Sequence, residues 1–310
     1  MQFFGETSID FLGKRKIAFI VSGVLILIGI VSLIIKGGPS YGIDFVGGTE
    51  VSILYSQDKQ TSTLRDALAS IGFGKAEIKQ FGSPRSFLVR VQEQETGTEV
   101  SDKIVAALTQ ASPDDPPELR SVDSVGPKIG KELRTSAALS ILISLALIML
   151  YISVRFEFIF AVGSVIALFH DVLITLGIFS ILDLEISLAI IAAFLTLIGY
   201  SLNDTIVVFD RIRENFNLNR RESEATHRII NTSINQTLSR TVLTSGTTLI
   251  VIVVLFIFGG DVIHNFALCM LAGIVVGTYS SIFVASPVVA QWHQEHTRKK
   301  ARTKRPVRVR

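Results

Sequence analysis

The sequence predicts an α-helical membrane protein with six transmembrane helices and a soluble α+β domain inserted between the first and second helices. Three observations lead to this prediction. Hydrophobic residues make up 48% of the 310 residues, and the mean hydropathy of +0.49 is too high for a soluble chain of this length. The apolar residues form blocks of about 20, the length that crosses a bilayer as a helix. One stretch of ordinary polarity, residues 36–135, separates the first block from the others.

The first apolar block follows the cations Lys14, Arg15 and Lys16, and its 19 residues, Ile17–Ile35, carry no charge. This run is longer than the apolar core of a signal peptide, and no small-residue cleavage site follows it. We therefore expect an uncleaved transmembrane helix at 17–35. The preceding cations place residues 1–16 in the cytoplasm.

The polar stretch 36–135 alternates between strand-like and helix-like patterns. We expect a strand interrupted at Gly47–Gly48, then a helix, two strands, a second helix and a last strand, at 43–55, 61–71, 76–80, 87–92, 100–110 and 119–125. The β-α-β-β-α-β order predicts a small two-layer, ferredoxin-like domain. Asp114 and Asp115 stand beside prolines, so we expect them in a solvated turn.

Five further apolar segments follow this domain. We expect the corresponding spans at 136–154, 158–182, 186–209, 239–258 and 263–286, within a membrane region that ends near residue 292. A polar loop, 210–238, joins the fourth span to the fifth, and 293–310 forms a basic tail. The only cysteine, Cys269, lies in the last span, so no intrachain disulfide can form.

The basic residues indicate the orientation of these spans. They concentrate in 1–16, 155–157, 210–238 and the tail, which are cytoplasmic if the N-terminus is inside. Both termini are then cytoplasmic, and domain 36–135 is extracytoplasmic. Because the cations flank membrane segments, we expect the lipid bilayer and no nucleic acid as their partner, and we attribute the charge of the tail to attraction to anionic lipid.

The fourth span carries polar residues where a membrane helix is normally apolar. Tyr200, Asn203 and Asp204 share one helical face. A carboxylate at the centre of a membrane helix costs roughly 2.5–3.5 kcal/mol, and less near an edge. Such a group commonly faces the inside of a bundle and has a function, so Asp204 and Asn203 are candidate ion-coupling residues.

The fifth span is apolar only over Leu249–Phe258, ten residues, so it must include the preceding polar residues in order to cross. Counting back about 20 residues from Phe258 places Arg240 at the inner membrane edge, the depth estimated for Asp204. Arg240 is either an arginine that extends its side chain to the interface or the partner of Asp204 in a gated ion pair. The spacing does not decide between them.

The third span carries His170 and Asp171 near its centre, where two ionisable groups need partners. They form either a structural hydrogen-bonded cluster or a step in a proton relay. The last span contains Gly273 and Gly277, a spacing that permits close packing of helices.

Several motifs in their topological places resemble the SecF members of the SecD/SecF family of the bacterial Sec protein-export machinery. The resemblance extends from about residue 9 to about residue 290. The matching segments are Gly42–Gly48, Val125–Gly130, His170–Val172, Tyr200–Asn215, Ser239–Thr241 with Thr244–Ser245, and Gly277–Ser281.

The resemblance implies a subunit that pairs with SecD in a twelve-helix unit related to the resistance-nodulation-division (RND) exporters, so that this chain is one RND-like half. It implies a transport protein, not an enzyme, in the inner membrane, which uses the proton-motive force to assist exported polypeptides. The implied partners are SecD, the SecYEG channel and YajC. Family-essential charges correspond to Asp204 and Arg240.

Two functions remain open from the sequence. The chain is either an ion-coupled auxiliary transport subunit or a structural scaffold that joins SecD to the channel without ion coupling of its own. A free-standing exporter is disfavoured because only six spans and one outer domain are predicted. No cofactor is expected, and the coupling ion is a proton or sodium, because an aspartate with neighbouring hydroxyls serves either.

Overall fold

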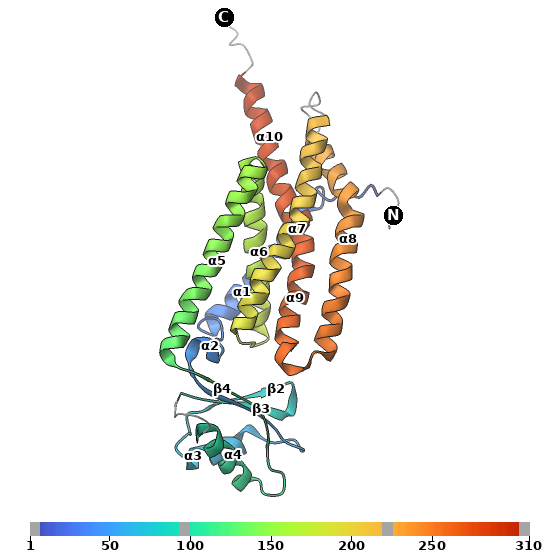
Figure 1. Cartoon of the computed structure of the whole chain (residues 1–310). Helices are drawn as coiled ribbons and strands as arrows, with labels where there is room; N and C mark the ends of the chain where they lie inside the picture. The colour runs from blue at the N-terminus through green and yellow to red at the C-terminus, as the bar shows by residue number, and fades with distance from the viewer. Residues whose placement is uncertain (1–6, 93–98, 219–225, 304–310) are drawn as a thin grey trace, which may run out of the picture. The chain divides into compact units, whose positions relative to one another are not determined.

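The computed structural model describes residues 7–92, 99–218 and 226–303, which divide into two compact units (Figure 1). One unit is formed by Met1–Ser40 and Ser140–Arg310 and contains most of the helices; the other is Tyr41–Leu139. Within the described residues, six helices are long and apolar enough to cross a membrane. The predicted fold class is therefore confirmed.

The smaller unit contains a four-stranded antiparallel sheet with the strand order β2-β3-β1-β4. Alternating apolar residues of the sheet, among them Val51, Ile53 and Val89, form a core with Leu64 and Ile104 of the two helices. This is the predicted β-α-β-β-α-β arrangement. The elements are β1 (Gly48–Leu54), α3 (Thr61–Ser70), β2 (Glu77–Phe81), β3 (Ser83–Val91), α4 (Glu99–Ala111) and β4 (Glu118–Val125).

The expected first strand, 43–55, is wrong in its first part. Ile43–Val46 forms one helical turn, α2, and the strand begins only at Gly48. Gly47 and Gly48 have φ angles of 79° and 118°, which favour glycine. A Cβ at Gly48 would also collide with the carbonyl oxygen of Val91 on the neighbouring strand. The glycine pair therefore changes the chain direction where a continuous strand was expected.

Asp115 was expected in a solvated turn, but its side chain is only 5% exposed. Its carboxylate accepts hydrogen bonds from the backbone N–H groups of Ser56 and Gln57, at 3.0 and 3.2 Å, and lies 3.3 Å from Nζ of Lys59. Burial acts to raise the pKa of Asp115, but these donors and the lysine charge outweigh it and hold the pKa below its usual value. Burial, with the Asp115 charge, raises the pKa of Tyr55 to about 12.

The larger unit is built from long helices, several of which extend beyond the predicted spans. The predicted loop 210–238 is helical over 210–218 and 226–238, while 219–225 lie outside the described residues. Residues 293–303 of the predicted tail are also helical, and 304–310 are not described. The elements are α1 (Arg15–Ile35), the part of α5 (Pro127–Arg155) from Ser140 onward, α6 (Phe158–Ile181), α7 (Leu188–Leu218), α8 (Thr226–Phe258), α9 (Gly260–Ser280), the π-helical turn η1 (Ser281–Ala285) and α10 (Ser286–Thr303).

The helical ends of α7 and α8 form because apolar residues recur on one face of each polar segment. Ile212 of α7 and Ile230 and Ile234 of α8 are fully buried, and they join a core with Phe160 and Phe209. Charge content alone indicated a loop, but the spacing of these isoleucines explains the helices.

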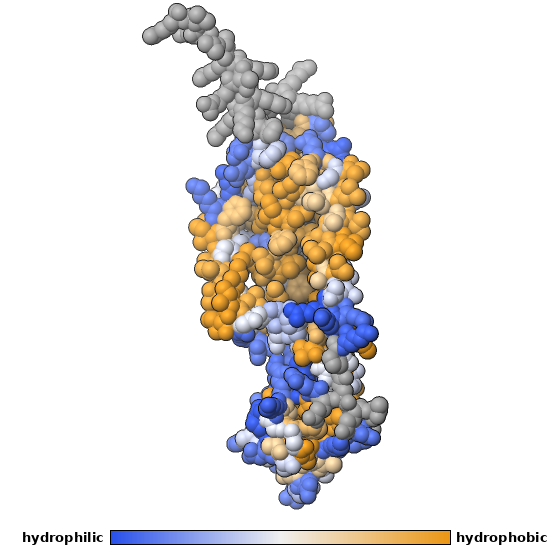
Figure 2. All heavy atoms as spheres, turned by 90° about the vertical axis from the view of Figure 1, so that its left-hand side faces the viewer, coloured by the Kyte–Doolittle hydropathy of each residue, from blue (hydrophilic) through white to orange (hydrophobic). Residues whose placement is uncertain are grey.

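Burial divides the helices of this unit into two groups. Between 44% and 61% of the most apolar windows of α6, α7 and the helix containing α9 are buried, against 6–17% in α1, α5 and α8. Figure 2 shows hydrophobic side chains forming a broad belt on the displayed face of the helical unit. Such a belt is expected of helices that face lipid or a partner's helices.

A segment before α1, residues 7–13, packs against α8, and we call it the N-terminal strap. Asn231 Oδ1 accepts a hydrogen bond from Phe11 N at 2.8 Å, and Asn235 Oδ1 accepts one from Ile9 N at 2.9 Å. Both asparagine Nδ2 groups donate to the carbonyl oxygen of Ile9. Phe11 and Leu12 are buried in the core described above. The strap therefore connects the start of α1 to α8.

Candidate functional site

Asp204 of α7 is a buried carboxylate, 5% exposed, inside the helical unit. Its Oδ2 accepts a hydrogen bond from Ser245 Oγ of α8 at 2.8 Å and a longer one from Thr278 Oγ1 of α9 at 3.5 Å. Thr278 Oγ1 also lies 2.9 Å from Ser245 Oγ. These hydrogen bonds to the carboxylate come from uncharged hydroxyl groups of two neighbouring helices.

Tyr200 continues this contact between α7 and α8. It lies one helical turn before Asp204, and its hydroxyl is 2.5 Å from Thr248 Oγ1. Thr248 donates in turn to the carbonyl oxygen of Thr244. Two of the polar residues predicted to share a face of α7 thus face hydroxyl-bearing residues of α8.

The structure does not join all the predicted ion-coupling residues. Within the described part of the chain, no ion pair links Asp204 to Arg240, and both Arg240 and Asn203 are exposed. In this structure the carboxylate of Asp204 is hydrogen-bonded to the hydroxyls of Ser245 and Thr278. The roles of Arg240 and Asn203 in ion coupling stay predictions.

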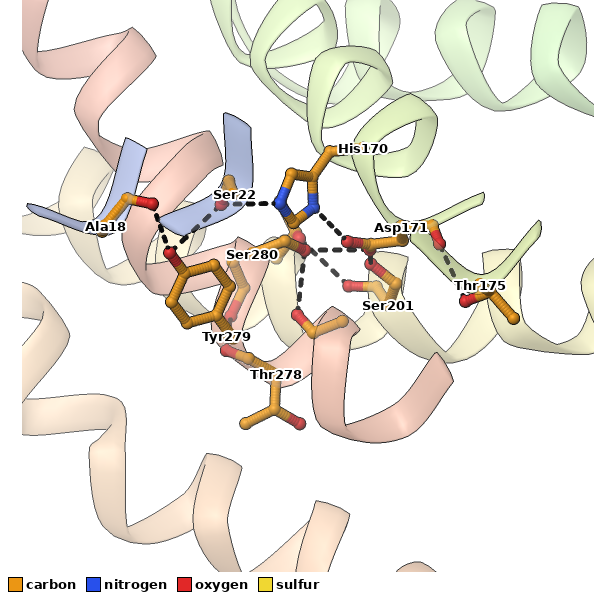
Figure 3. A network of polar contacts seen from close by, with 12 residues as sticks. Ala18, Ser22, His170, Asp171, Thr175, Ser201, Thr278, Tyr279 and Ser280 are labelled. Atoms are coloured by element: carbon orange, nitrogen blue, oxygen red, sulfur yellow. Dashed lines mark hydrogen bonds and ion pairs between the residues drawn. The ribbon is translucent and has the colours of Figure 1, made fainter. Parts of the chain in front are cut away.

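A second buried carboxylate, Asp171 of α6, lies in the network shown in Figure 3. Its Oδ1 is 2.9 Å from His170 Nδ1, and its Oδ2 accepts hydrogen bonds from Ser201 Oγ of α7 at 2.5 Å and Ser280 Oγ of α9 at 2.8 Å. Its own carbonyl oxygen accepts from Thr175. Asp171 is 1% exposed. Its hydrogen bonds join α6, α7 and α9 at one point.

The network continues from His170 to α1. His170 Nε2 is 2.9 Å from Ser22 Oγ, which is 3.1 Å from the Tyr279 hydroxyl. Tyr279 donates to the carbonyl oxygen of Ala18 at 2.8 Å, and its ring stacks on the His170 ring. Sequence reasoning missed Ser22, since a lone serine in an apolar helix is ordinary. Tyr279 lies in the family motif Gly277–Ser281, but nothing in that motif indicated histidine as its neighbour.

The glycines predicted to allow close packing lie where α9 meets α7. A Cβ at Gly277 would be 3.0 Å from the Cβ of Ser201, and one at Gly273 would collide with the side chain of Leu197. A second crossing was not predicted: a Cβ at Gly29 of α1 would be 2.8 Å from the Cα of Gly177 of α6. These crossings bring Ser22, Ser201 and Ser280 within reach of the His170–Asp171 pair.

The geometry can perform a limited set of tasks. Among the described residues, no three His, Cys, Asp or Glu side chains lie close enough to hold a metal ion together. The Asp204 carboxylate with the oxygens of Ser245 and Thr278 can accept a proton, and hard oxygen ligands also suit sodium. Fold and site therefore define a multi-pass membrane protein with a buried carboxylate at a junction of helices.

Comparison with known proteins gives the family. The model of the SecD/SecF C-terminal region of protein export membrane proteins matches residues 103–295, and that of the SecD/SecF GG motif matches residues 31–59. The chain belongs to the SecD/SecF family of protein-export membrane proteins and is a transport protein.

Individual relatives agree with this assignment. The chain is 47% identical to the protein translocase subunit SecF of Rhodothermus marinus, over 94% of this chain and 95% of that protein. It is 43% identical to the subunit of the same name from Escherichia coli O157:H7, over 91% and 87%.

Among solved structures, the chain resembles SecDF of Thermus thermophilus, described as a translocon-associated membrane protein. The TM-score is 0.84 and the identity 40%, over 93% of this chain. A SecDF structure in a super-membrane-facing form matches with a TM-score of 0.70 and 38% identity. The chain spans 39% and 41% of those two chains.

Proposed function

We propose that this chain is the SecF-type subunit of a complex driven by the proton-motive force. Together with SecD, it assists protein translocation through the SecYEG channel and release of the exported chain on the outer side. The complex lies in the inner membrane, with both termini of this chain in the cytoplasm and with YajC as a further partner. Asp204 carries the coupling proton.

The observation that supports this proposal is the environment of Asp204. A carboxylate that serves only to hold helices together gains most from a cation, because an uncompensated buried charge is costly. Asp204 instead contacts Ser245 and Thr278, whose hydroxyls can donate to an ionised carboxylate or accept from a protonated one. The site can therefore change its protonation state without losing its hydrogen-bond partners.

Arg240 fits the same proposal as a mobile partner. Its side chain is exposed on α8, the helix that supplies Ser245. A movement of α8 that brings this guanidinium to Asp204 favours the carboxylate, and its withdrawal favours proton uptake. Arg240→Lys keeps the charge but loses the planar fork of donors, so we expect it to reduce coupling.

The test is gradient-driven export by the complex with SecD and SecYEG in vesicles, with proton and sodium gradients imposed separately. We expect Asp204→Asn to assemble normally but to lose the stimulation of export by the gradient. Asp210→Asn is the matched control, because Asp210 lies on the same helix, is 59% exposed and makes only a surface ion pair with Arg155.

The alternative function, a scaffold that joins SecD to the channel, gives a different result. The Asp204 site would then serve helix packing, and Asp204→Asn would either impair assembly with SecD or change nothing. Wild-type stimulation by the imposed gradient in the assembled Asp204→Asn complex would exclude the coupling role. Stimulation of export by a sodium gradient alone would keep Asp204 as the coupling residue but identify sodium as the coupling ion.

A further inference from the structure

The contacts of His170 form an unbroken row that begins at Asp171 and ends at α1 (Figure 3). In order, they join Asp171 Oδ1 to His170 Nδ1 at 2.9 Å, His170 Nε2 to Ser22 Oγ at 2.9 Å, and Ser22 Oγ to the Tyr279 hydroxyl at 3.1 Å. The row ends where Tyr279 meets the carbonyl oxygen of Ala18 at 2.8 Å. Each of these contacts is a hydrogen bond only if one hydrogen lies between its two atoms.

The end of the row fixes the direction of every bond in it. A carbonyl oxygen only accepts, so Tyr279 gives its single hydrogen to Ala18. Ser22 must then donate to Tyr279, and His170 Nε2 must donate to Ser22. One further hydrogen is needed between His170 Nδ1 and Asp171 Oδ1.

An ionised Asp171 and a neutral His170 supply one hydrogen too few for this row. If the imidazole hydrogen were on Nδ1, Ser22 would have to donate to Nε2. The Ser22 and Tyr279 oxygens would then face each other at 3.1 Å without a hydrogen between them. The hydroxyls of Ser201 and Ser280 cannot make up the shortage, because they donate to the other oxygen of Asp171.

Charge leads to the same result independently. His170 is 6% exposed and Asp171 is 1% exposed, inside a bundle that carries a hydrophobic belt. An ionised Asp171 beside a neutral His170 would leave a net negative charge there, which is costly in a membrane helix. One additional proton, on either partner, brings the net charge of the pair to zero.

Among the residues that the structure describes, Tyr279 of α9 is the further titratable side chain in contact with this network, through its ring on His170 and its hydroxyl on Ser22. The elements α1 and α7 face the pair with the hydroxyls of Ser22 and Ser201. Neither hydroxyl supplies a charge that could neutralise Asp171 in place of the proton.

We propose that the His170–Asp171 pair is a second proton-binding site of this protein, occupied in this structure, and that its proton maintains the hydrogen bond between Ser22 of α1 and Tyr279 of α9. The site is separate from Asp204. Loss of the proton reverses the Ser22 hydroxyl toward His170 and breaks its bond to Tyr279, so that α1 and α9 keep the bond from Tyr279 to Ala18 but lose this second one. The proposal stands whether or not Asp204 couples export to a gradient.

The test is nitrogen NMR of the full chain in lipid nanodiscs with ¹⁵N-labelled histidine, the His170 signals being assigned with His170→Gln. At pH 7 we expect an imidazolium, or a neutral ring with hydrogen on Nε2 beside a protonated Asp171. The form with a protonated Asp171 is identified by an infrared band of a protonated carboxyl group that is lost in Asp171→Asn. A neutral His170 beside an ionised Asp171, whichever ring nitrogen carries the hydrogen, overturns the proposal.

A second variant tests the row itself. Tyr279→Phe removes the acceptor that makes Ser22 donate away from His170, so Ser22 can donate to Nε2 and the extra proton is needed less. We expect the pair to carry the additional proton in a smaller fraction of molecules at pH 7 than in the wild type, as measured by the same nitrogen and infrared signals. Tyr151→Phe, in which the replaced tyrosine is exposed on α5, should leave this fraction unchanged. An unchanged fraction in Tyr279→Phe contradicts the proposal.

Discussion

At the scale of single residues, buried aspartates have different surroundings, and therefore different roles, in the two units. Asp204 and Asp171 lie inside a helical bundle and are hydrogen-bonded to side-chain hydroxyls and, for Asp171, to a histidine. Asp115 lies in the small α+β unit and receives backbone N–H groups and a lysine. Fixed backbone donors and a cation stabilise the charged form. Asp115 is therefore an anion at neutral pH and has a structural role.

We predict that Asp115→Asn destabilises the α+β unit at neutral pH. The pKa of Asp115 is lowered by folding, so its contribution to the free energy of unfolding is complete above the pKa of the unfolded chain, about 3.9. The contribution disappears as the pH falls through the lower, folded value. Amide hydrogen exchange of residues 48–56 in the full chain measures it.

The control for this prediction is Asp114→Asn, the adjacent aspartate. We expect faster amide hydrogen exchange at pH 7 in Asp115→Asn and not in Asp114→Asn. The difference between Asp115→Asn and the wild type should shrink in acid. An equal effect of both substitutions, or an effect that grows as the pH falls, would contradict the structural role of Asp115.

At the scale of helices, glycine positions decide how closely the elements pack. We predict that Gly277→Leu impairs folding, because a side chain there would press on Ser201 where α9 crosses α7. Overpacking of this kind costs about 1–3 kcal/mol. Gly273→Leu should behave alike, since it meets Leu197. The yield of monodisperse protein and its thermal midpoint measure the effect.

The matched control for the glycine prediction is Gly23→Leu on α1. A Cβ at Gly23 would meet nothing within 4 Å, so this position has room for a side chain toward the surroundings. A normal yield and midpoint for both α9 variants would show that the close crossing is dispensable.

The N-terminal strap is the second feature at this scale. We predict that the double substitution Asn231→Ala and Asn235→Ala releases the strap, because it removes the side chains that bond the main chain of Ile9 and Phe11. Each lost hydrogen bond contributes about 0.5–1.5 kcal/mol. Amide hydrogen exchange over residues 7–13 should become faster, while Thr232→Ala, on the exposed face of α8, should not change it. Unchanged exchange in the double variant would mean that burial of Phe11 and Leu12 holds the strap alone.

At the scale of the whole molecule, the helical unit has a buried centre and an exposed periphery. Helices α6 and α7 carry Asp171 and Asp204 and, with α9, are the more buried ones, whereas α1, α5 and α8 expose many apolar side chains. This distribution is that of a protein solvated by lipid or by other membrane helices. Charges close to the apolar segments then determine the orientation.

We predict that the α+β unit is extracytoplasmic and that α10 emerges in the cytoplasm. Cys269 is buried, so single cysteines introduced elsewhere can be labelled against a low background. Ser62→Cys on α3 should react with a membrane-impermeant maleimide added to spheroplasts, because position 62 is exposed. Glu295→Cys on α10 should react only after the membrane is opened. The reverse pattern would invert the topology.

The sequence by itself determined the fold class, the strand and helix order of the small unit, and the chain positions of Asp171 and Asp204. These features depend on the length of apolar segments and on the local periodicity of apolar residues, and both can be read from residues close together in the chain. The tertiary structure alone decided that Asp204 is hydrogen-bonded to Ser245, and that His170 reaches Ser22, 148 residues away. Partner choice depends on helix rotation and crossing, which are set by contacts such as Gly29 with Gly177. Such contacts join residues far apart in the chain, so no local pattern in the sequence specifies them.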